Sequence, residues 1–199
     1  MKRYDIINTM IKKYNYVNYL EIGVRDPSQC FDKIIAEHKD GVDPEPLGNN
    51  VNYPITSDQF FELIKDEDIK YDIIFIDGLH LMEQVDKDIE NSLKHLTDNG
   101  VIVMHDCNPP TEFYQRENYE VDGQFPPWNG TVWKSFAKLR LNNQDLDLCC
   151  VDCDWGIGII RRGVSSNPKL SGKLDFNFLN KNRKYLLNLI SVNEFIKGY

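Results

Sequence analysis

The sequence of 199 residues contains no apolar run that reaches the roughly 18 residues of a membrane-spanning helix. It also lacks an apolar secretory segment after Met1, and we therefore expect a cytoplasmic protein. Positive charge is scarce, because 23 Lys and Arg residues face 31 Asp and Glu residues and leave a net charge of −8. This balance argues against a nucleic-acid or acidic-membrane binder that relies on a broad basic surface. The five cysteines, an odd number, are more typical of a reducing compartment than of a disulfide framework.

Hydrophobic residues make up 41% of the chain and aromatic residues 12%, which is enough for the core of a folded domain. Segments with strand-like and helix-like apolar spacing alternate along the chain. The sequence predicts helices near residues 4–14, 28–38, from 57 onward, 81–96 and 131–141, and strands near 17–23, 41–43, 54–55, 71–77, 101–104, 145–152 and 156–162. The last two strands have a short connection, which is typical of an antiparallel hairpin. We therefore expect an α/β fold with a doubly wound, mostly parallel, Rossmann-like sheet and a C-terminal hairpin.

The chain divides into a main domain over residues 1–164 and a C-terminal segment over 165–199. Residues 165–172 are turn-rich and polar, and we interpret them as a linker. The residues that follow have helical spacing, so they either pack back on the domain or contact another subunit in a homodimer. Within the domain, residues 107–130 are too long for an ordinary connection, and long loops in compact domains are often functional.

Acidic residues and a glycine mark the ends of three expected strands. Glu21 and Gly23 close the first strand, Asp43 closes the second, and Asp77 closes the strand over 71–77. A glycine at a strand-to-helix turn allows the backbone to approach a ligand closely. An acidic residue 22 positions after Glu21, at the next strand end, is well placed to accept both hydroxyls of a ribose. The chain lacks a G-x-G-x-x-G spacing at Gly23, which disfavours a pyrophosphate-binding oxidoreductase.

Four segments carry a resemblance to a known family: residues 21–24 (EIGV), 42–44 (VDP), 76–80 (IDGLH) and 100–106 (GVIVMHD). Together they resemble class I S-adenosylmethionine-dependent methyltransferases. They are most similar to a group of small O-methyltransferase-like proteins with an IDG-x-H strand end, often linked to sugar and natural-product modification. The resemblance covers residues 15–162 and implies the class I methyltransferase fold. The turn over residues 24–28 departs from the family, which usually has further glycines there.

The resemblance implies where the cofactor S-adenosylmethionine binds. Glu21 and Gly23 would lie at its methionine end, and Asp43 would bind the ribose hydroxyls. Asp58 would accept a hydrogen bond from the adenine amino group, and Asp77 would complete the cofactor site.

The resemblance also implies two catalytic residues, Asp77 and His80, three positions apart at a strand end. His80 would take a proton from a substrate hydroxyl, since a neutral imidazole is a competent base near pH 7. Asp77, His105 and Asp106 match the positions of a possible divalent metal site, for Mg²⁺ or Mn²⁺. The alternative is that both histidines bond strand-end backbone.

The insert over residues 107–130 would form the wall or lid of the acceptor site. Possible acceptor contacts are Asn108, Trp128, Asn129 and Trp133, which include rings for stacking on a sugar and amides for its hydroxyls; the alternative is that these are ordinary core residues. We expect methyl transfer to a hydroxyl of a small molecule, with a sugar or sugar-linked metabolite first, while catechol-like acceptors stay open. A non-catalytic binding module with a degenerate cofactor pocket is the second hypothesis.

Overall fold

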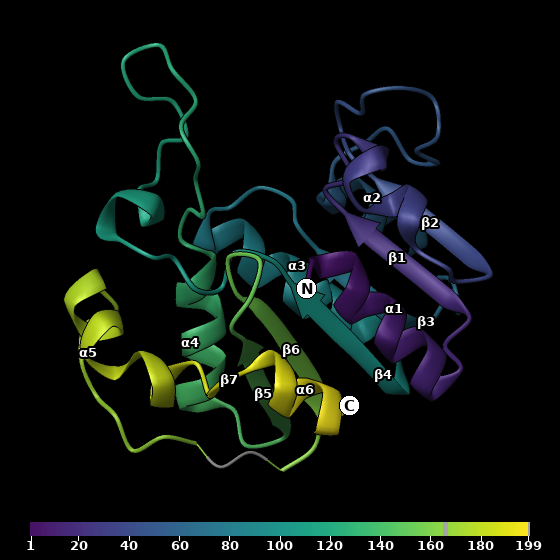
Figure 1. Cartoon of the computed structure of the whole chain (residues 1–199). Helices are drawn as coiled ribbons and strands as arrows, with labels where there is room; N and C mark the ends of the chain where they lie inside the picture. Colours follow the sequence, from purple (N-terminus) through teal and green to yellow (C-terminus); the bar gives the residue numbers. More distant parts are fainter. Residues whose placement is uncertain (165–166, 199) are drawn as a thin grey trace.

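A computed structural model describes residues 1–164 and 167–198. Its strands form one mixed sheet in the order β2-β1-β3-β4-β6-β5-β7 (Figure 1). The strands are β1 (Asn18–Ile22), β2 (His38–Val42), β3 (Tyr71–Ile76), β4 (Leu96–Met104), β5 (Leu146–Val151), β6 (Ile157–Arg162) and β7 (Leu189–Ile190). The helices are α1 (Arg3–Tyr14), α2 (Ser57–Ile64), α3 (Met82–Lys94), α4 (Val132–Asn142), α5 (Phe176–Leu186) and α6 (Val192–Gly198).

The expected α/β architecture is confirmed, because helices cover both faces of the sheet. Side chains of β3 alternate between the faces: Ile74 and Ile76 join one core cluster, whereas Ile73 and Phe75 join the other. The first cluster contains apolar residues of α2, α3, α4 and α5, and the second contains those of α1 and α6. Strands β1 to β4 pair in parallel, and β6 runs antiparallel between β4 and β5. The predicted C-terminal hairpin is therefore confirmed.

The predicted helix over residues 28–38 is wrong. Two short 3-10 turns, Pro27–Gln29 and Phe31–Lys33, stand there, and β2 already begins at His38. The side chain of Asn8 in α1 donates to the carbonyl of Lys33 and accepts from the N–H of Ile35, at 2.9 and 3.1 Å. Backbone groups that a helix would have used are thus bonded to α1, because burial of this segment against α1 takes precedence over its local propensity.

The predicted strand at residues 54–55 is also wrong, because the sheet has only an isolated bridge between Val42 and Tyr53 at this place. Tyr53 donates to the carbonyl of Gly41 and accepts from the N–H of Asp43. Pro54 has no N–H, so the pairing does not continue past it.

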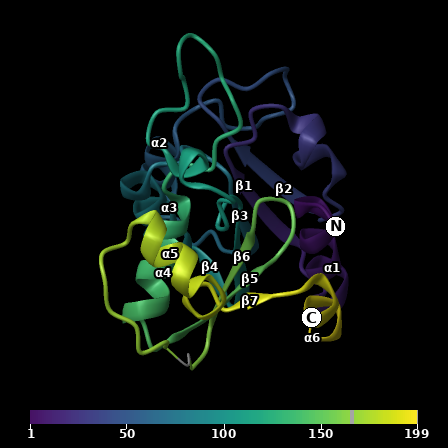
Figure 2. The same cartoon turned by 60° about the vertical axis from the view of Figure 1, so that its left-hand side comes forward.

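The C-terminal segment packs back on the domain and crosses from one face of the sheet to the other. α5 lies beside α4, β7 pairs in parallel with β5, and α6 lies on the side of α1 (Figure 2). The predicted linker over 165–172 includes residues 165 and 166, which lie outside the described residues. Within the described ranges, no helix combines the length and the apolar character that crossing a membrane requires.

We expect α6 to stabilise the domain through Phe195, whose side chain is 0% exposed in the second core cluster. Phe195→Ala should lower the free energy of unfolding by about 3–5 kcal/mol, because it removes a buried ring and leaves a cavity. Urea denaturation measures this change. Ile196→Ala is the matched control, since Ile196 is 57% exposed, and it should change stability by less than about 0.5 kcal/mol. Equal losses in the two variants would contradict this role of Phe195.

Candidate active site

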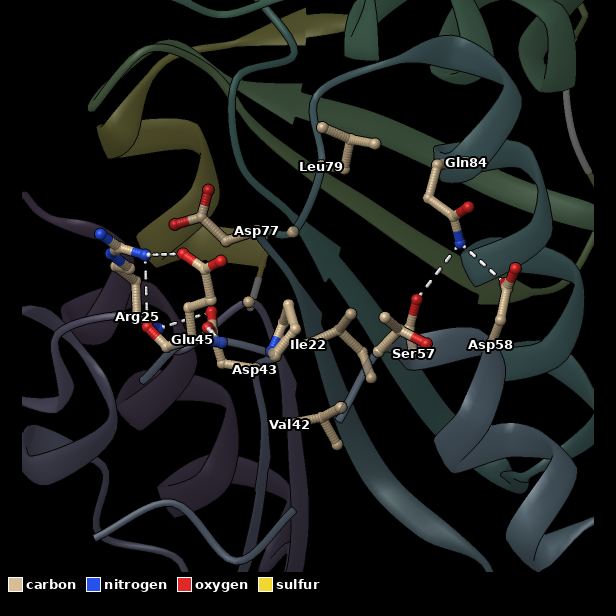
Figure 3. A pocket seen from close by; sticks show the side chains of 14 residues that line it. Ile22, Arg25, Val42, Asp43, Glu45, Ser57, Asp58, Asp77, Leu79 and Gln84 are labelled. Atoms are coloured by element: carbon tan, nitrogen blue, oxygen red, sulfur yellow. Dashed lines mark hydrogen bonds and ion pairs between the residues drawn. The ribbon is translucent and has the colours of Figure 1, made fainter. Parts of the chain in front are cut away.

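A cavity of about 480 Å³ opens at the carboxyl ends of β1, β2 and β3 (Figure 3). β1 lies between β2 and β3, so the strand order reverses there, and open α/β sheets bind ligands at such a point. The lining comes from three strand ends and from the first turns of α2 and α3; it includes Ile22, Gly23, Val42, Asp43, Asp77, Gly78, Ser57, Asp58 and Gln84. Its size is that of a small-molecule site.

Gly23 allows the ends of β1 and β3 to approach each other. Its φ is +89°, and a Cβ atom there would overlap the carbonyl oxygen of Asp77. The N–H of Asp77 donates to the carbonyl of Ile22 at 2.8 Å, so the two strand ends are bonded directly. Any side chain at position 23 would push Asp77 out of place.

We expect Gly23→Ala to destabilise the protein and to weaken binding of S-adenosylhomocysteine by at least about tenfold, because the new methyl group displaces the end of β3. Gly48→Ala is the matched control: Gly48 also has a positive φ, of +98°, but its added Cβ would have no neighbour within 4 Å. Thermal melts and calorimetric titration measure both effects. If the two variants lose the same stability and affinity, the loss comes from the positive φ alone. That result would contradict a role for the close approach of Gly23 to Asp77.

Asp43 shapes the turn that follows β1. Its Oδ2 accepts from the N–H of Arg25 and its Oδ1 from the N–H of Glu45, each at 2.8 Å. Arg25 adopts a φ of +43°, a conformation that glycine usually supplies. The turn over residues 24–28 is therefore built without the family's further glycines, since a carboxylate holds it from β2.

Asp58 lies at the opposite end of the cavity, in the first turn of α2. Its Oδ1 accepts from Nε2 of Gln84 at 2.9 Å, and its Oδ2 lies 3.2 Å from Nζ of Lys87. The Gln84 bond holds the pKa of Asp58 below its usual value, with a smaller contribution from Lys87 and against a small effect of burial. Gln84 also lies within hydrogen-bond distance of Ser57. Gln84 was not predicted from the sequence, although its place in the first turn of α3, behind the strand end at Asp77, was a usable signal.

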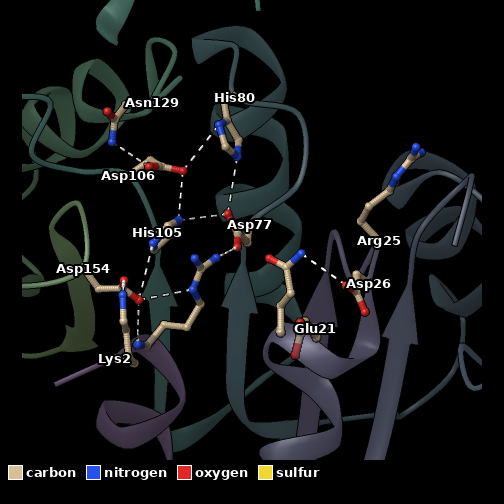
Figure 4. Close-up of polar contacts among 12 residues, drawn as sticks. Lys2, Glu21, Arg25, Asp26, Asp77, His80, His105, Asp106, Asn129 and Asp154 are labelled. Atoms are coloured by element: carbon tan, nitrogen blue, oxygen red, sulfur yellow. Dashed lines mark hydrogen bonds and ion pairs between the residues drawn. The ribbon is translucent and has the colours of Figure 1, made fainter. Parts of the chain in front are cut away.

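A second group of polar side chains adjoins the cavity at Asp77 (Figure 4). Oδ1 of Asp77 lies 3.3 Å from Nε2 of His80 and 3.2 Å from Nδ1 of His105. Oδ2 of Asp106 lies 3.4 Å from Nδ1 of His80 and 2.9 Å from Nδ1 of His105. Nδ2 of Asn129 donates to Oδ1 of Asp106 at 2.6 Å. Two carboxylates thus hold two imidazoles between them.

These contacts shift the pKa values of the group. Burial alone would lower the pKa of His105, but Asp77 and Asp106 outweigh it and raise the pKa to about 10. The pKa of His80 is also raised, because Asp77 and Asp106 outweigh its burial. Burial would raise the pKa of Asp77, yet His105, His80 and Arg3 hold it well below its usual value. The contacts within the group thus favour the charged forms of Asp77 and of both histidines.

Arg3 in the first turn of α1 reaches the same group, and the sequence analysis missed it. Its Nη1 pairs with Oδ2 of Asp77, and its Nε lies 3.3 Å from Oδ2 of Asp154. Nζ of Lys2 lies 2.9 Å from Oδ1 of the same Asp154. No local signal marks Arg3, because its partners are 74 and 151 positions away in the chain.

The structure brings most of the expected cofactor residues together. Gly23, Asp43, Asp58 and Asp77 all line the cavity. Glu21 does not, because it points to the opposite face of β1, where it is 1% exposed and bonded to the hydroxyl of Tyr19. Burial raises the pKa of Glu21 to about 8, against the effect of the Tyr19 hydrogen bond.

The structure places the four expected acceptor contacts in different surroundings. Trp128 stacks on His80 with ring centroids 4.9 Å apart. Trp133 is 0% exposed and belongs to the first core cluster. The prediction of Trp133 as an acceptor contact is therefore wrong, and it is a core residue. Asn129 is 0% exposed and bonded to Asp106, so it positions that carboxylate and does not face an acceptor. Asn108 lies away from the cavity, between Asp152 and Arg183.

Three side chains, Asp77, His80 and Asp106, offer possible metal ligands within 4.8 Å of one another, and this set contains His80 where the sequence resemblance implied His105. The carboxylate oxygens of this set are already engaged. Arg3 and the two imidazoles occupy Asp77, while both imidazoles and Asn129 occupy Asp106. Arg3 already pairs with one oxygen of Asp77, so a divalent cation bound through Asp77 would lie near a guanidinium, and repulsion between the two positive charges disfavours a metal in this arrangement.

Comparison with solved structures places the fold among methyltransferases. The S-adenosylhomocysteine-bound methyltransferase of Podospora anserina is similar with a TM-score of 0.55 and 16% identity, over 79% of this chain and 76% of that one. The O-methyltransferase of Bacillus cereus in complex with S-adenosylhomocysteine has a TM-score of 0.55 and 13% identity, over 78% and 79%. The mycinamycin-pathway methyltransferase MycE, in complex with Mg, S-adenosylhomocysteine and mycinamycin VI, has a TM-score of 0.50 and 14% identity, over 90% of this chain and 53% of that one.

At these identities the solved structures show the fold, which is that of class I S-adenosylmethionine-dependent methyltransferases. Residues 22–107 match a sequence family described as a methyltransferase domain. Comparison with curated proteins finds no match. The matched segment, which runs from the end of β1 to just past β4 and supplies Gly23, Asp43, Asp77 and His105, is thus similar to a methyltransferase domain. The resemblance stated from the sequence motifs is confirmed.

Proposed function

We propose that the chain transfers a methyl group from S-adenosylmethionine to a hydroxyl group of a small molecule. One observation carries the proposal: Asp77 belongs both to the lining of the cavity and to the polar group that contains His80. A cofactor in the cavity and an acceptor beside His80 would therefore both lie next to the carboxylate of Asp77. Placement of two reactants in one line is the main contribution to catalysis in such a transfer.

The cavity fits the cofactor in its chemistry. Asp43 is 7% exposed and each of its oxygens, after one backbone hydrogen bond, keeps a lone pair for a ribose hydroxyl. Asp58 and Gln84 offer an acceptor and an amide for the edge of adenine. The space over Gly23, which a Cβ could not share with Asp77, accommodates the methionine end. When bound, S-adenosylmethionine supplies an electrophilic methyl group.

His80 acts as the general base in this proposal. The acceptor hydroxyl would give its proton to a ring nitrogen of neutral His80 while its oxygen takes the methyl group that the bound cofactor would supply; the electron pair of the broken sulfur–carbon bond would stay on the cofactor. Trp128 stacks on the ring and the Trp128 carbonyl lies 3.3 Å from Nδ1, so the imidazole is held in one plane. Asp77 stabilises the imidazolium that results.

We infer a sugar or sugar-linked metabolite as the acceptor class. The aromatic rings of the 107–130 segment support this: Tyr119 lies 5.8 Å from Trp128 and 5.3 Å from Phe125, centroid to centroid. Tyr119 and Phe125 are 54% and 66% exposed, so their faces are open to a ligand that extends outward from His80. The sequence resemblance to sugar-modifying enzymes points the same way.

The first experiment is calorimetric titration of the protein with S-adenosylhomocysteine, followed by a screen of sugars, nucleotide sugars and catechols with labelled S-adenosylmethionine. Micromolar binding and transfer of label to an oxygen would support the proposal. Binding without transfer to any acceptor would favour the non-catalytic module. Absence of binding would contradict the cofactor site itself.

A further inference from the structure

We propose that Arg3 is the fixed positive charge of the methyl-transfer site, and that it holds Asp77 in place and disfavours a divalent metal there. The inference rests on the proposed function, since it concerns the same site. Arg3 is a positioning residue here: it acts on the reaction through Asp77 and His80 and does not itself meet the reacting atoms.

The guanidinium is held from two sides. Nη1 pairs with Oδ2 of Asp77 at the end of β3, while Nε and the backbone N–H of Arg3 lie 3.3 and 2.9 Å from Oδ2 of Asp154. Asp154 lies in the turn between β5 and β6, and its side chain is 2% exposed. A planar guanidinium between two carboxylates has little freedom to move, since its donors lie in a rigid plane.

The backbone of Arg3 is equally fixed. α1 begins at Arg3, and its inner face is anchored by Ile6, Ile7 and Met10, each 0% exposed in the second core cluster. Asp154 also accepts from the N–H of Arg3, so the start of the helix is bonded to the β5–β6 turn. The charge is therefore delivered to the carboxyl ends of the strands by a helix whose inner face is packed in the core.

The carboxylates around Arg3 leave little room for another cation. Asp77 pairs with Arg3 through one oxygen and with the two imidazoles through the other. Asp106 has the two imidazoles on one oxygen and Asn129 on the other. A metal on these two residues would lie near the permanent charge of Arg3, and like charges in a buried site repel strongly.

The consequence for the reaction is a carboxylate that stays charged and stays in place. Asp77 contacts Nε2 of His80 through the oxygen that Arg3 does not use. Because Oδ2 of Asp77 is paired with Arg3, its Oδ1 stays turned toward His80. Asp77 thereby holds the imidazole beside the cavity. Removal of the guanidinium would free Asp77 and expose a pair of carboxylates that suits a divalent cation.

The test measures Mn²⁺ binding to the full chain by electron paramagnetic resonance. The four proteins compared are the wild type, Arg3→Ala, Arg3→Lys and the double variant Arg3→Ala/Asp77→Asn. We expect the wild type and Arg3→Lys to bind no Mn²⁺ at micromolar concentration. Arg3→Ala should gain one site with at least about tenfold higher affinity, because a like charge has been removed, and Asp77→Asn should abolish that site. Lys2→Ala is the matched control, since Lys2 contacts Asp154 but has no recorded contact with Asp77.

Two results would overturn the inference: a micromolar Mn²⁺ site in the wild type that Asp77→Asn removes, or no gain of affinity in folded Arg3→Ala. A merely structural ion pair would change the melting temperature of Arg3→Ala without creating a metal site. If Arg3→Ala does not fold, Arg3→Gln, which keeps a hydrogen-bonding side chain without the charge, takes its place in the same titration. Titration with S-adenosylhomocysteine in parallel separates the two proposals, because a failure of cofactor binding in the wild type contradicts the proposed function whatever Mn²⁺ does.

Discussion

Asp43→Ala should weaken binding of S-adenosylhomocysteine by at least about a hundredfold, because two hydrogen bonds to a charged acceptor contribute about 1.5–3 kcal/mol each. The carboxylate also accepts from the N–H groups of Arg25 and Glu45, so its loss loosens the turn after β1 as well. Both effects act on the cofactor and neither on the acceptor. Calorimetric titration measures the dissociation constant directly.

Two further variants sharpen this experiment. Asp43→Asn keeps one oxygen as an acceptor, so its affinity should lie between those of the wild type and Asp43→Ala. Asp32→Ala removes an exposed carboxylate from a 3-10 turn and should leave the affinity unchanged. An Asp43→Ala protein that binds as tightly as the Asp32→Ala control would remove the ribose site from the cavity.

His80→Gln should lower turnover by about a hundredfold to ten-thousandfold while it leaves the affinity for S-adenosylhomocysteine nearly intact, because only proton transfer is lost. His80 lies outside the residues that line the cavity, which is why the two readouts are expected to separate. His38→Gln is the matched control, since the His38 side chain is 68% exposed and its recorded ion pair is with Glu37. Equal losses of turnover and cofactor affinity would contradict the assignment of His80 as the base.

The pH dependence of turnover gives a second check on His80. The carboxylates of Asp77 and Asp106 outweigh burial and raise the pKa of His80. The base is active in its neutral form, so turnover should fall as the pH drops through this raised value. The acidic limb should therefore lie above pH 6.5, the usual value for histidine, and it should disappear from the residual activity of His80→Gln. A limb below pH 6.5 would contradict the environment described for His80.

The periodicity of apolar residues predicted the sheet well where segments are locally consistent. β3 and β4 follow from apolar runs at 71–77 and 101–104, because strands buried on both faces need apolar side chains at nearly every position. The segment over 28–38 has helical spacing too, yet α1 bonds its backbone groups and it forms 3-10 turns. Local propensity could not reveal this, since the competing partner, Asn8, lies 25 and 27 positions away from the groups it bonds.

The candidate site shows the same division. Gly23, Asp43 and Asp77 could be identified from the sequence because each lies directly after a strand, and the carboxyl ends of parallel strands meet at one edge of a sheet. Asp106 was implied by the family resemblance. Trp133 and Asn129 were misjudged, because an aromatic ring or an amide in a long segment carries no sign of its burial. Glu21 was placed at the right strand end but on the wrong face, which the two-residue period of a strand decides.

The sequence by itself determined the methyltransferase-like fold class and the strand ends at which the candidate site lies, because these depend on residues that are neighbours along the chain. Only the tertiary structure decided which side chains pair with the carboxylates of the site. Arg3 reaches Asp77 from the first turn of α1, and Asn129, near the end of the 107–130 segment, reaches Asp106. Contacts between residues 74 and 23 positions apart are set by how helices pack on the sheet, and no spacing in the sequence records that packing.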